Sequence, residues 1–418
     1  MALMGEPLSG PGWALYQGDA LTVLRGMEEG SVNCCVTSPP YWGLRRYLPE
    51  ESAERQYELG SEKGLDCLGW ATGEKCGECY VCHLVEVFRE VRRVLHESGV
   101  AFLNLGDSYA GSGKGEQSEE KRSKNWQPIY GHNNNVPSGL KPKDLCGVPW
   151  RIALALQADG WWLRSEITWC KGNPMPESVT DRPTKATEKV FLLTKASVYW
   201  WDAYAVRERG SDDSHGGGNR SQGRKTNRLY GDAAHLGLVD AQPAGEGGRN
   251  LRNWWLVNTE AFHGAHFATF PRALVRPMIR AGCPPLTCSA CSKPWRRVMK
   301  RTKEPDALVK GSHFDKGKTG GRDGGDRTQP GQRYAKEALG WSPTCSCDAP
   351  TIRGTVLDPF AGAGTSLLVA IEEGRNAVGI ELNSRYVAMA EQRLQTARRV
   401  LPFAADEGET VPDCEKKE

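Results

Sequence analysis

The residues from 37 to 42 (TSPPYW) combine hydroxyl groups, two prolines and two aromatic rings in one short turn after an apolar run. Consecutive prolines fix φ and remove two backbone donors, so the carbonyl oxygens of this turn have no competing local N–H group and can face a ligand. Ser38 adds a hydroxyl acceptor, and Tyr41 adds an aromatic face. Taken alone, the motif is equally typical of a rigid structural turn. The rest of the chain therefore decides whether the turn is catalytic.

A glycine-rich turn at 358–365 (DPFAGAGT) follows another apolar run and precedes a helical pattern. Glycines let the backbone approach a ligand closely, and the first turn of a helix offers unpaired N–H groups. Glu381 ends the next predicted strand, 23 residues after Asp358. A carboxylate at that position can accept hydrogen bonds from ribose hydroxyls. A tight strand-to-helix turn would explain the glycines alone, but together with Glu381 they predict a nucleotide-like cofactor site.

Most of the 14 cysteines fall into tight local clusters, which favours metal binding over the disulfides of a small secreted domain. One cluster consists of two close pairs that resemble a zinc ribbon, and sulfur ligands suit Zn²⁺. The other is less regular, because one member precedes the rest by nine residues and another enters a predicted helix. The predicted zinc ligands are Cys288, Cys291, Cys345 and Cys347 in the first cluster and Cys67, Cys76, Cys79 and Cys82 in the second.

Alternating strands and helices must position these groups. Continuous apolar runs predict buried strands, and apolar residues spaced three and four apart predict helices. Their alternation predicts a doubly wound α/β sheet. The predicted strands are 32–37, 100–105, 163–169, 189–194, 354–358 and 377–381, and the predicted helices are 21–27, 84–95, 148–158, 365–373 and 385–399.

The sequence DPFAGAGT, followed by GIELN at 379–383, resembles the S-adenosylmethionine motifs of amino-group DNA methyltransferases. The resemblance implies a Rossmann-like methyltransferase sheet with S-adenosylmethionine as cofactor. HFATFP at 266–271 resembles a further cofactor motif of that family, and Gly18-Asp19 resembles another, although an Asp before a helix is also a common N-cap. The implied cofactor-binding residues are Asp19, His266, Phe267, Thr269, Phe270, Asp358, Phe360, Gly362, Gly364, Thr365, Glu381 and Asn383.

The same resemblance makes the TSPPYW turn the catalytic loop, formed by Ser38, Pro39, Pro40 and Tyr41. An exocyclic amino nitrogen is a poor nucleophile because its lone pair is delocalised into the base. Acceptors at Ser38 and the Pro39 carbonyl would draw that nitrogen toward tetrahedral geometry, ready to attack the sulfonium methyl. Tyr41 would stack on a base flipped out of the duplex.

The TSPPYW turn lies about 320 residues before DPFAGAGT. This order resembles the beta group of bacterial and phage DNA amino-methyltransferases, as does the central block at 160–185. A Ser before Pro-Pro resembles the cytosine-N4 enzymes, whereas Asp is usual there in adenine-N6 enzymes. We expect cytosine N4 as the target, with adenine N6 as the alternative. The same residues are also compatible with a methylase that acts on RNA and with a catalytically inactive zinc-ribbon DNA-binding protein.

The insertion between Cys291 and Cys345 carries 13 basic and 6 acidic residues, a charge of +7, against +3 for the whole chain. It is a candidate contact for the phosphates of double-stranded DNA, with solvated loop charge as the alternative. No apolar run approaches the ~20 residues that span a bilayer, so we expect a cytoplasmic protein without a membrane partner. No nuclease motif is present, so a restriction endonuclease would be a separate chain, and a homodimer is left open.

These inferences divide the 418 residues into a methyltransferase domain with two insertions and a tail. We expect a catalytic half at 13–204, containing the cysteine cluster 67–82 and a loop at 110–143; a target-recognition region at 205–263; a cofactor-binding half at 264–282 and 351–400; a zinc-ribbon-like insertion at 283–350; and a disordered tail at 404–418.

Overall fold

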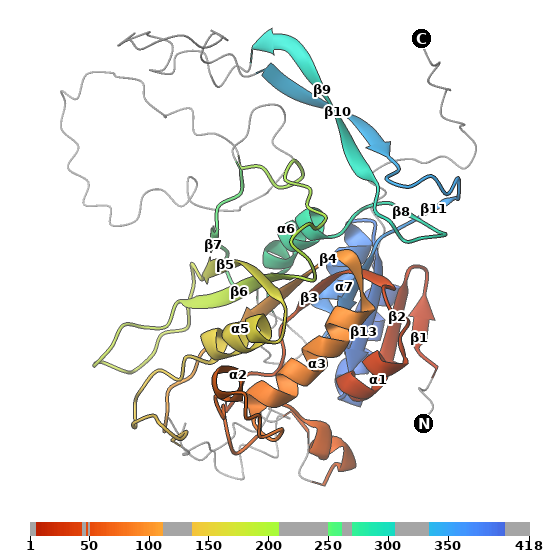
Figure 1. Ribbon diagram of the computed structural model, residues 1–418. Helices are drawn as coiled ribbons and strands as arrows, with labels where there is room; N and C mark the ends of the chain where they lie inside the picture. Colours follow the sequence, from red (N-terminus) through yellow and green to blue (C-terminus); the bar gives the residue numbers. More distant parts are fainter. Residues whose placement is uncertain are drawn as a thin grey trace, which may run out of the picture.

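A computed structural model describes residues 6–43, 47–48, 51–111, 136–208, 250–260, 270–305 and 334–397. Nine strands among them form one sheet in the order β1-β2-β13-β12-β3-β4-β6-β5-β7 (Figure 1). These strands are β1 Leu8–Gly10, β2 Trp13–Gln17, β3 Val32–Thr37, β4 Leu95–Leu105, β5 Trp162–Cys170, β6 Thr187–Thr194, β7 Trp254–Leu256, β12 Thr355–Asp358 and β13 Asn376–Glu381.

The middle of the sheet is parallel. Strands β2, β13, β12, β3 and β4 run in one direction, whereas β6 runs antiparallel to both β4 and β5. Every residue of β3 is buried, as expected for a parallel strand that helices cover on both faces. The carboxyl ends of the parallel strands and the amino end of β6 therefore lie at the same edge of the sheet.

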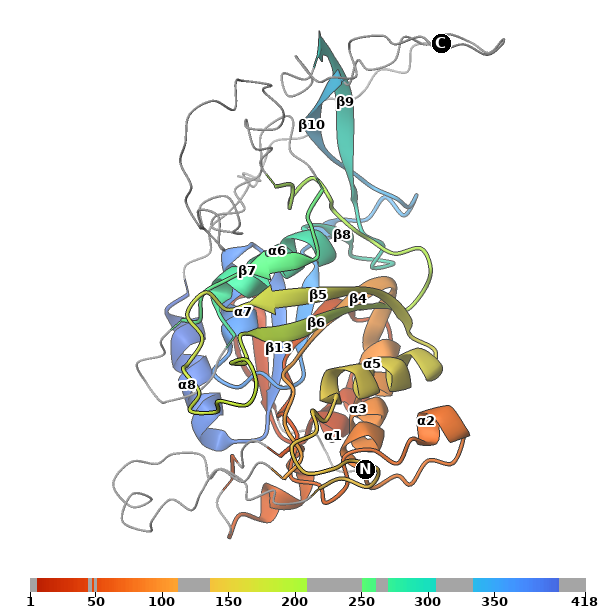
Figure 2. The same ribbon diagram turned by 90° about the vertical axis from the view of Figure 1, so that its left-hand side faces the viewer.

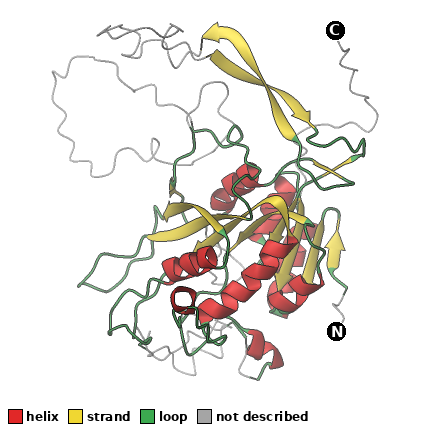
Figure 3. Ribbon diagram, in the orientation of Figure 1, coloured by secondary structure: helices red, strands yellow, loops and turns green. Residues whose placement is uncertain are grey.

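Helices cover both faces of this sheet (Figures 2 and 3). On one face α1, α3 and α5 bury Leu24, Phe88 and Ile152 in one core, and on the other α6, α7 and α8 bury Leu274 and Leu367 in a second. The helices are α1 Ala20–Gly26, α3 Tyr80–Val94, α5 Val148–Ala158, α6 Arg272–Gly282, α7 Thr365–Glu372 and α8 Ser384–Gln395. Two shorter elements, the 3-10 helix η1 (Ala53–Tyr57) and α2 (Gly69–Thr72), lie between β3 and α3.

The cysteine-bearing insertion forms two small sheets of its own. Strand β8 (Thr287–Cys288) pairs with β11 (Thr351–Ile352), and β9 (Arg296–Pro305) pairs with β10 (Tyr334–Ser342). The β9–β10 hairpin projects away from the central sheet, at the top of Figure 1. Arg297 anchors it to the domain through an ion pair with Asp202 at 2.6 Å.

The structure confirms the doubly wound α/β fold and each strand and helix expected from the apolar patterns, with shifts at their ends. Strand β2 and helix α6 were not predicted. The first is a strand of five residues, and the second has Pro277 in its interior, which is unusual in a helix. Strand β7 places the end of the expected recognition region in the central sheet. Most of that region, most of the 110–143 loop and the whole tail lie outside the described residues. No helix among those described is long and apolar enough to cross a membrane.

Candidate active site

The two candidate motifs meet at one edge of the sheet. Strands β3 and β12 are parallel neighbours, with Cys35 beside Leu357, so the turns that follow them start side by side. A hydrogen bond joins the two strand ends directly: the Thr37 hydroxyl donates to Asp358 Oδ1 at 2.6 Å. Thr37 and Asp358, which are 321 positions apart in the chain, thus lie together at the carboxyl ends of adjacent strands.

Asp358 is fully buried, and both of its carboxylate oxygens have partners. Besides Thr37, the Phe360 amide donates to Oδ1 at 3.1 Å and the Ser366 hydroxyl donates to Oδ2. Burial raises the pKa of Asp358 to about 6 despite these donors. The carboxyl group therefore holds the glycine turn, the start of α7 and the end of β3 together.

Glu381 stands at the end of β13, on the other side of the same turn. One carboxylate oxygen accepts from the Gly362 amide at 2.8 Å and the other from the Asn383 amide at 2.8 Å. Burial raises the pKa of Glu381 to about 7. Asn383 in turn caps α8, because its side-chain oxygen accepts from the Arg385 amide at 2.9 Å. The second acid and the glycine turn form one hydrogen-bonded unit.

The glycines of the turn have different environments. Gly364 has φ +73° and caps α7, and a Cβ there would lie 2.9 Å from the Cβ of Ala390. Gly362 has φ +52°, and a Cβ there would meet nothing within 4 Å. Both residues need the left-handed conformation that glycine adopts readily. Only Gly362 of these two faces open space, which leaves room for a ligand against the backbone.

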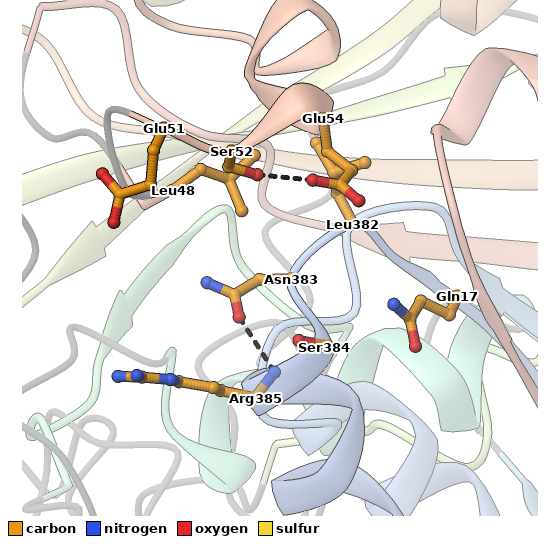
Figure 4. A pocket seen from close by; sticks show the side chains of 9 residues that line it. All are labelled: Gln17, Leu48, Glu51, Ser52, Glu54, Leu382, Asn383, Ser384 and Arg385. Atoms are coloured by element: carbon orange, nitrogen blue, oxygen red, sulfur yellow. Dashed lines mark hydrogen bonds between the residues drawn. The ribbon is translucent and has the colours of Figure 1, made fainter.

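A pocket opens next to this unit, beyond the ends of β2 and β13 (Figure 4). Figure 4 shows the Asn383 side chain turned toward the Arg385 amide, with Gln17 to one side and Ser52 and Glu54 across the cavity. The pocket is polar and adjoins Glu381 in the chain. Its lining is formed by Gln17, Leu48, Glu51, Ser52, Glu54, Leu382, Asn383, Ser384 and Arg385.

The TSPPYW turn carries a polar network that the sequence did not reveal. The Tyr41 hydroxyl donates to Glu188 Oε2 at 2.7 Å and lies 3.2 Å from the Ser38 hydroxyl. Asn104 donates to the Tyr41 hydroxyl at 2.7 Å, and Lys171 donates to Glu188 Oε1 at 2.5 Å. Burial, followed by the charge of Glu188, raises the pKa of Tyr41 well above its usual value. The phenol therefore stays protonated and serves as a donor.

Sequence reasoning missed Asn104, Lys171 and Glu188 because each lies in or beside a strand that appeared purely structural. Strand β6 is antiparallel, so its first residues, including Glu188, lie at the edge where the parallel strands end. The available signal was a polar residue at the start of an otherwise apolar strand, 147 positions after Tyr41.

A second set of contacts fixes the backbone of the loop. The Tyr80 hydroxyl donates to the Pro40 carbonyl at 2.7 Å, and the buried Trp42 indole donates to the Glu62 carbonyl at 3.1 Å. The ring of Tyr41 lies against Gly106, where a Cβ would come within 2.5 Å of its Cε2. Trp42 thus packs into the domain, and Pro40 already has a donor on its carbonyl.

Each predicted cysteine cluster comes together in space. In both groups, Cys67, Cys76, Cys79 and Cys82 and Cys288, Cys291, Cys345 and Cys347, all four sulfurs lie within 4.8 Å of one another. His83 directly follows the first group in sequence, but its ring pairs with Glu62 at 3.0 Å. The two sets of sulfurs are arranged as metal ligands would be.

The remaining predicted residues have mixed positions. Asp19 caps α1, where its side chain accepts from the Thr22 amide at 2.8 Å. Phe270 packs, partly buried, against the second core. His266, Phe267 and Thr269 lie outside the described residues.

Known proteins that this chain resembles in sequence include DNA methylases and Type II methyltransferases. A family model described as DNA methylase matches residues 32–287 and 345–392. The chain is 37% identical over 394 residues to the Type II methyltransferase M.XycI of Xanthomonas campestris pv. cyanopsidis, covering 94% of this chain and 91% of that protein. It is 36% identical over 390 residues to the Type II methyltransferase M.Cfr9I of Citrobacter freundii, with 93% and 90% coverage. A solved structure of the PvuII DNA methyltransferase (cytosine-N4-specific) covers 94% of this chain and 90% of its own, with 15% identity and a TM-score of 0.48.

Proposed function

Because this chain belongs to the DNA methylase family of N6 and N4 amino-methyltransferases, we propose that it transfers a methyl group from S-adenosylmethionine to cytosine N4 in double-stranded DNA. The observation that carries this proposal is the Thr37–Asp358 hydrogen bond, which sets the Ser38 turn directly beside the glycine turn. A methyl donor over one turn and an amino acceptor over the other would then be within transfer range.

The described residues fit S-adenosylmethionine. Gly362 leaves open space against the backbone, and Glu381 offers a carboxylate beside a polar pocket. We assign Glu381, with Asn383 beside it, to the ribose, and the 358–365 turn to the methionine portion. When bound, the cofactor supplies an electrophilic methyl group on a sulfonium.

On the acceptor side, the Ser38 hydroxyl accepts a hydrogen bond from one N–H of the target amino group, and the Pro39 carbonyl accepts a hydrogen bond from the other. Tyr41 provides a ring against which the flipped base stacks, while its hydroxyl is held by Glu188 and Asn104. Because the ring rests on Gly106, it presents a fixed face. The loop thereby draws the amino nitrogen out of conjugation and aims its lone pair at the methyl group.

The choice of target base rests on resemblance: a Ser before Pro-Pro, as at Ser38, resembles the cytosine-N4 enzymes. Adenine N6 is the alternative. The curated relatives are named Type II methyltransferases. We therefore place this chain in a restriction–modification setting, with any endonuclease supplied by a separate protein. A homodimer stays a prediction, which sedimentation of the purified chain tests.

We propose that both cysteine clusters bind Zn²⁺ and that the β9–β10 hairpin contacts the DNA backbone. Four sulfur ligands in each cluster suit a closed structural metal site. Strand β9 begins Arg-Arg and continues with further basic residues. Phosphate contacts of this kind position the protein without reading sequence.

Transfer of labelled methyl from S-adenosylmethionine to duplex DNA tests the proposal, followed by mass spectrometry of the nucleosides. We expect N4-methylcytosine from the wild-type chain and none from Tyr41→Ala. N6-methyladenine would shift the target to adenine, and equal or better transfer to RNA would refute the choice of DNA. DNA and cofactor binding without transfer would identify a binding protein that has lost catalysis.

A further inference from the structure

The cysteine cluster nearest the candidate active site connects the loop at 58–66 to the start of α3. The Sγ atoms of Cys67 and Cys82 lie 3.6 Å apart, and those of Cys76 and Cys82 lie 4.0 Å apart. Four sulfurs around a tetrahedral ion with bonds of ~2.3 Å are spaced by about 3.8 Å. The backbone amides of Cys76 and Glu78 donate to the sulfurs of Cys67 and Cys76, at 3.5 and 3.4 Å. Such donors stabilise sulfurs that carry negative charge.

The surrounding segment needs a cross-link, because it has almost no core of its own. Residues 71–78 are all exposed, and between 66 and 79 only Gly69 and Cys79 are buried. A segment of this kind cannot offset its conformational entropy by burying apolar surface, and metal ligation is a common substitute. With four thiolates and no oxygen or nitrogen ligand, the site selects a soft or borderline ion such as Zn²⁺.

The cluster touches the catalytic loop along two routes. Along the first, Cys79 is followed directly by Tyr80, whose amide donates to the Gly64 carbonyl at 3.1 Å and whose hydroxyl donates to the Pro40 carbonyl at 2.7 Å. Tyr80 is completely buried, so its side chain forms a rigid connection between the first turn of α3 and the Pro-Pro turn.

The second route runs through the segment before Cys67. There the Gly60 carbonyl accepts from the Gly43 amide at 2.9 Å, and the Glu62 carbonyl accepts from the Trp42 indole at 3.1 Å. A metal bound by Cys67 and Cys79 would fix two parts of the chain relative to each other. One is the segment whose carbonyls bond to residues 42–43, and the other is the helix whose Tyr80 bonds to Pro40.

We propose that Cys67, Cys76, Cys79 and Cys82 bind one Zn²⁺ ion whose purpose is to hold the backbone of residues 40–43 in position for the reaction. This inference rests on the proposed function only for what the loop does. Metal content and loop rigidity can be measured without any methyl transfer. The cluster formed by Cys288, Cys291, Cys345 and Cys347 serves as the matched control, since no described contact links it to the loop.

The experiment uses the full chain purified without added metal, with zinc measured by mass spectrometry and backbone rigidity by hydrogen–deuterium exchange over residues 38–43. We expect two zinc ions per chain. Cys76→Ser should lose one zinc and speed exchange at 38–43 at least tenfold, whereas Cys345→Ser should lose one zinc and leave that exchange unchanged. Tyr80→Phe should keep both ions yet speed exchange at 38–43, because it removes only the hydrogen bond from the Tyr80 hydroxyl to the Pro40 carbonyl.

Full zinc content in Cys76→Ser would overturn the metal site. Loss of its zinc with unchanged exchange at 38–43 would overturn the link to the loop, and so would an equal effect of Cys345→Ser. Thermal melts of each variant check that the domain is still folded, and Tyr80→Phe tests the link even if the cysteine variants unfold. Absence of methyl transfer by the wild-type chain would count against the proposed function alone, because neither readout depends on it.

Discussion

Replacing Glu188 with glutamine tests whether the polar network around the proposed catalytic loop contributes to the proposed reaction. The carboxylate accepts from Tyr41 at 2.7 Å, from Asn104 at 3.0 Å and from Lys171 at 2.5 Å. A glutamine keeps the shape but has one acceptor oxygen and no charge, so either Tyr41 or Lys171 loses its acceptor. The Lys171 and Glu188 side chains are only 19% and 10% exposed, so water replaces the lost bond poorly.

A hydrogen bond to a charged group contributes about 1.5–3 kcal/mol. If that loss falls on the position of Tyr41, and through it on Ser38, kcat should drop by roughly 10- to 150-fold, at 1.36 kcal/mol per factor of ten. The KM for S-adenosylmethionine should change little, because the proposed cofactor residues lie on β12 and β13. Steady-state methyl transfer, with thermal melting to show that the variant is folded, measures both quantities.

Glu166→Gln is the matched control. Glu166 on β5 forms an ion pair with Lys189 on β6. Lys189 directly follows Glu188, so the Lys189 side chain points to the opposite face of the sheet from that of Glu188. This change should cost some stability and leave kcat near the wild-type value. A wild-type kcat in Glu188→Gln, or an equal loss in both variants, would refute a positioning role for Glu188.

Four further tests address the cofactor side of the site. Burial raises the pKa of Glu381 from 4.5 to about 7. The protonated side chain therefore stabilises the fold fully below pH 4.5, and this contribution is lost as the pH rises through 7. Glu381→Gln should flatten that part of the pH dependence of the melting temperature. Because Glu381 becomes protonated as the pH falls through about 7, the affinity of the wild-type chain for S-adenosylmethionine should decrease below that pH. An affinity that calorimetry finds independent of pH would contradict the assignment of Glu381 to the ribose. Thr37→Val removes the donor to Asp358 and should cost about 1.5–3 kcal/mol in urea unfolding, whereas Thr37→Ser should restore most of it. Gly362→Ala should weaken cofactor binding by about tenfold or more with a stability cost near 1 kcal/mol, and unchanged binding would show that the space beside it is not used.

The parts of this site that the sequence predicts are those encoded locally. Strands β3 and β12 are continuous apolar runs, and the groups that follow them carry their own patterns of prolines or glycines. Parallel strands end at one edge, so the meeting of the two turns followed from the fold class. The four-cysteine groups were predicted for the same reason, since most of their members are close in sequence.

The partners of the TSPPYW turn were not predictable in this way. Asn104, Lys171 and Glu188 reach Tyr41 only because β6 reverses direction, and single-sequence patterns do not give strand order. Tyr80 lies before the predicted helix 84–95 and was not singled out, because its contact depends on which group its hydroxyl reaches. Contacts between distant residues are decided by packing, which local propensity does not encode.

The pairing of β3 with β12 also has a consequence for synthesis of the protein. A contact that closes a loop of about 320 residues is entropically costly and forms late in folding. On the ribosome, β3 emerges early but has no β12 beside it until the chain has been extended by the 321 positions that separate Thr37 from Asp358, at about 5–20 residues per second. A nascent or truncated chain that lacks β12 and β13 therefore has the TSPPYW turn without the glycine turn and Glu381 beside it.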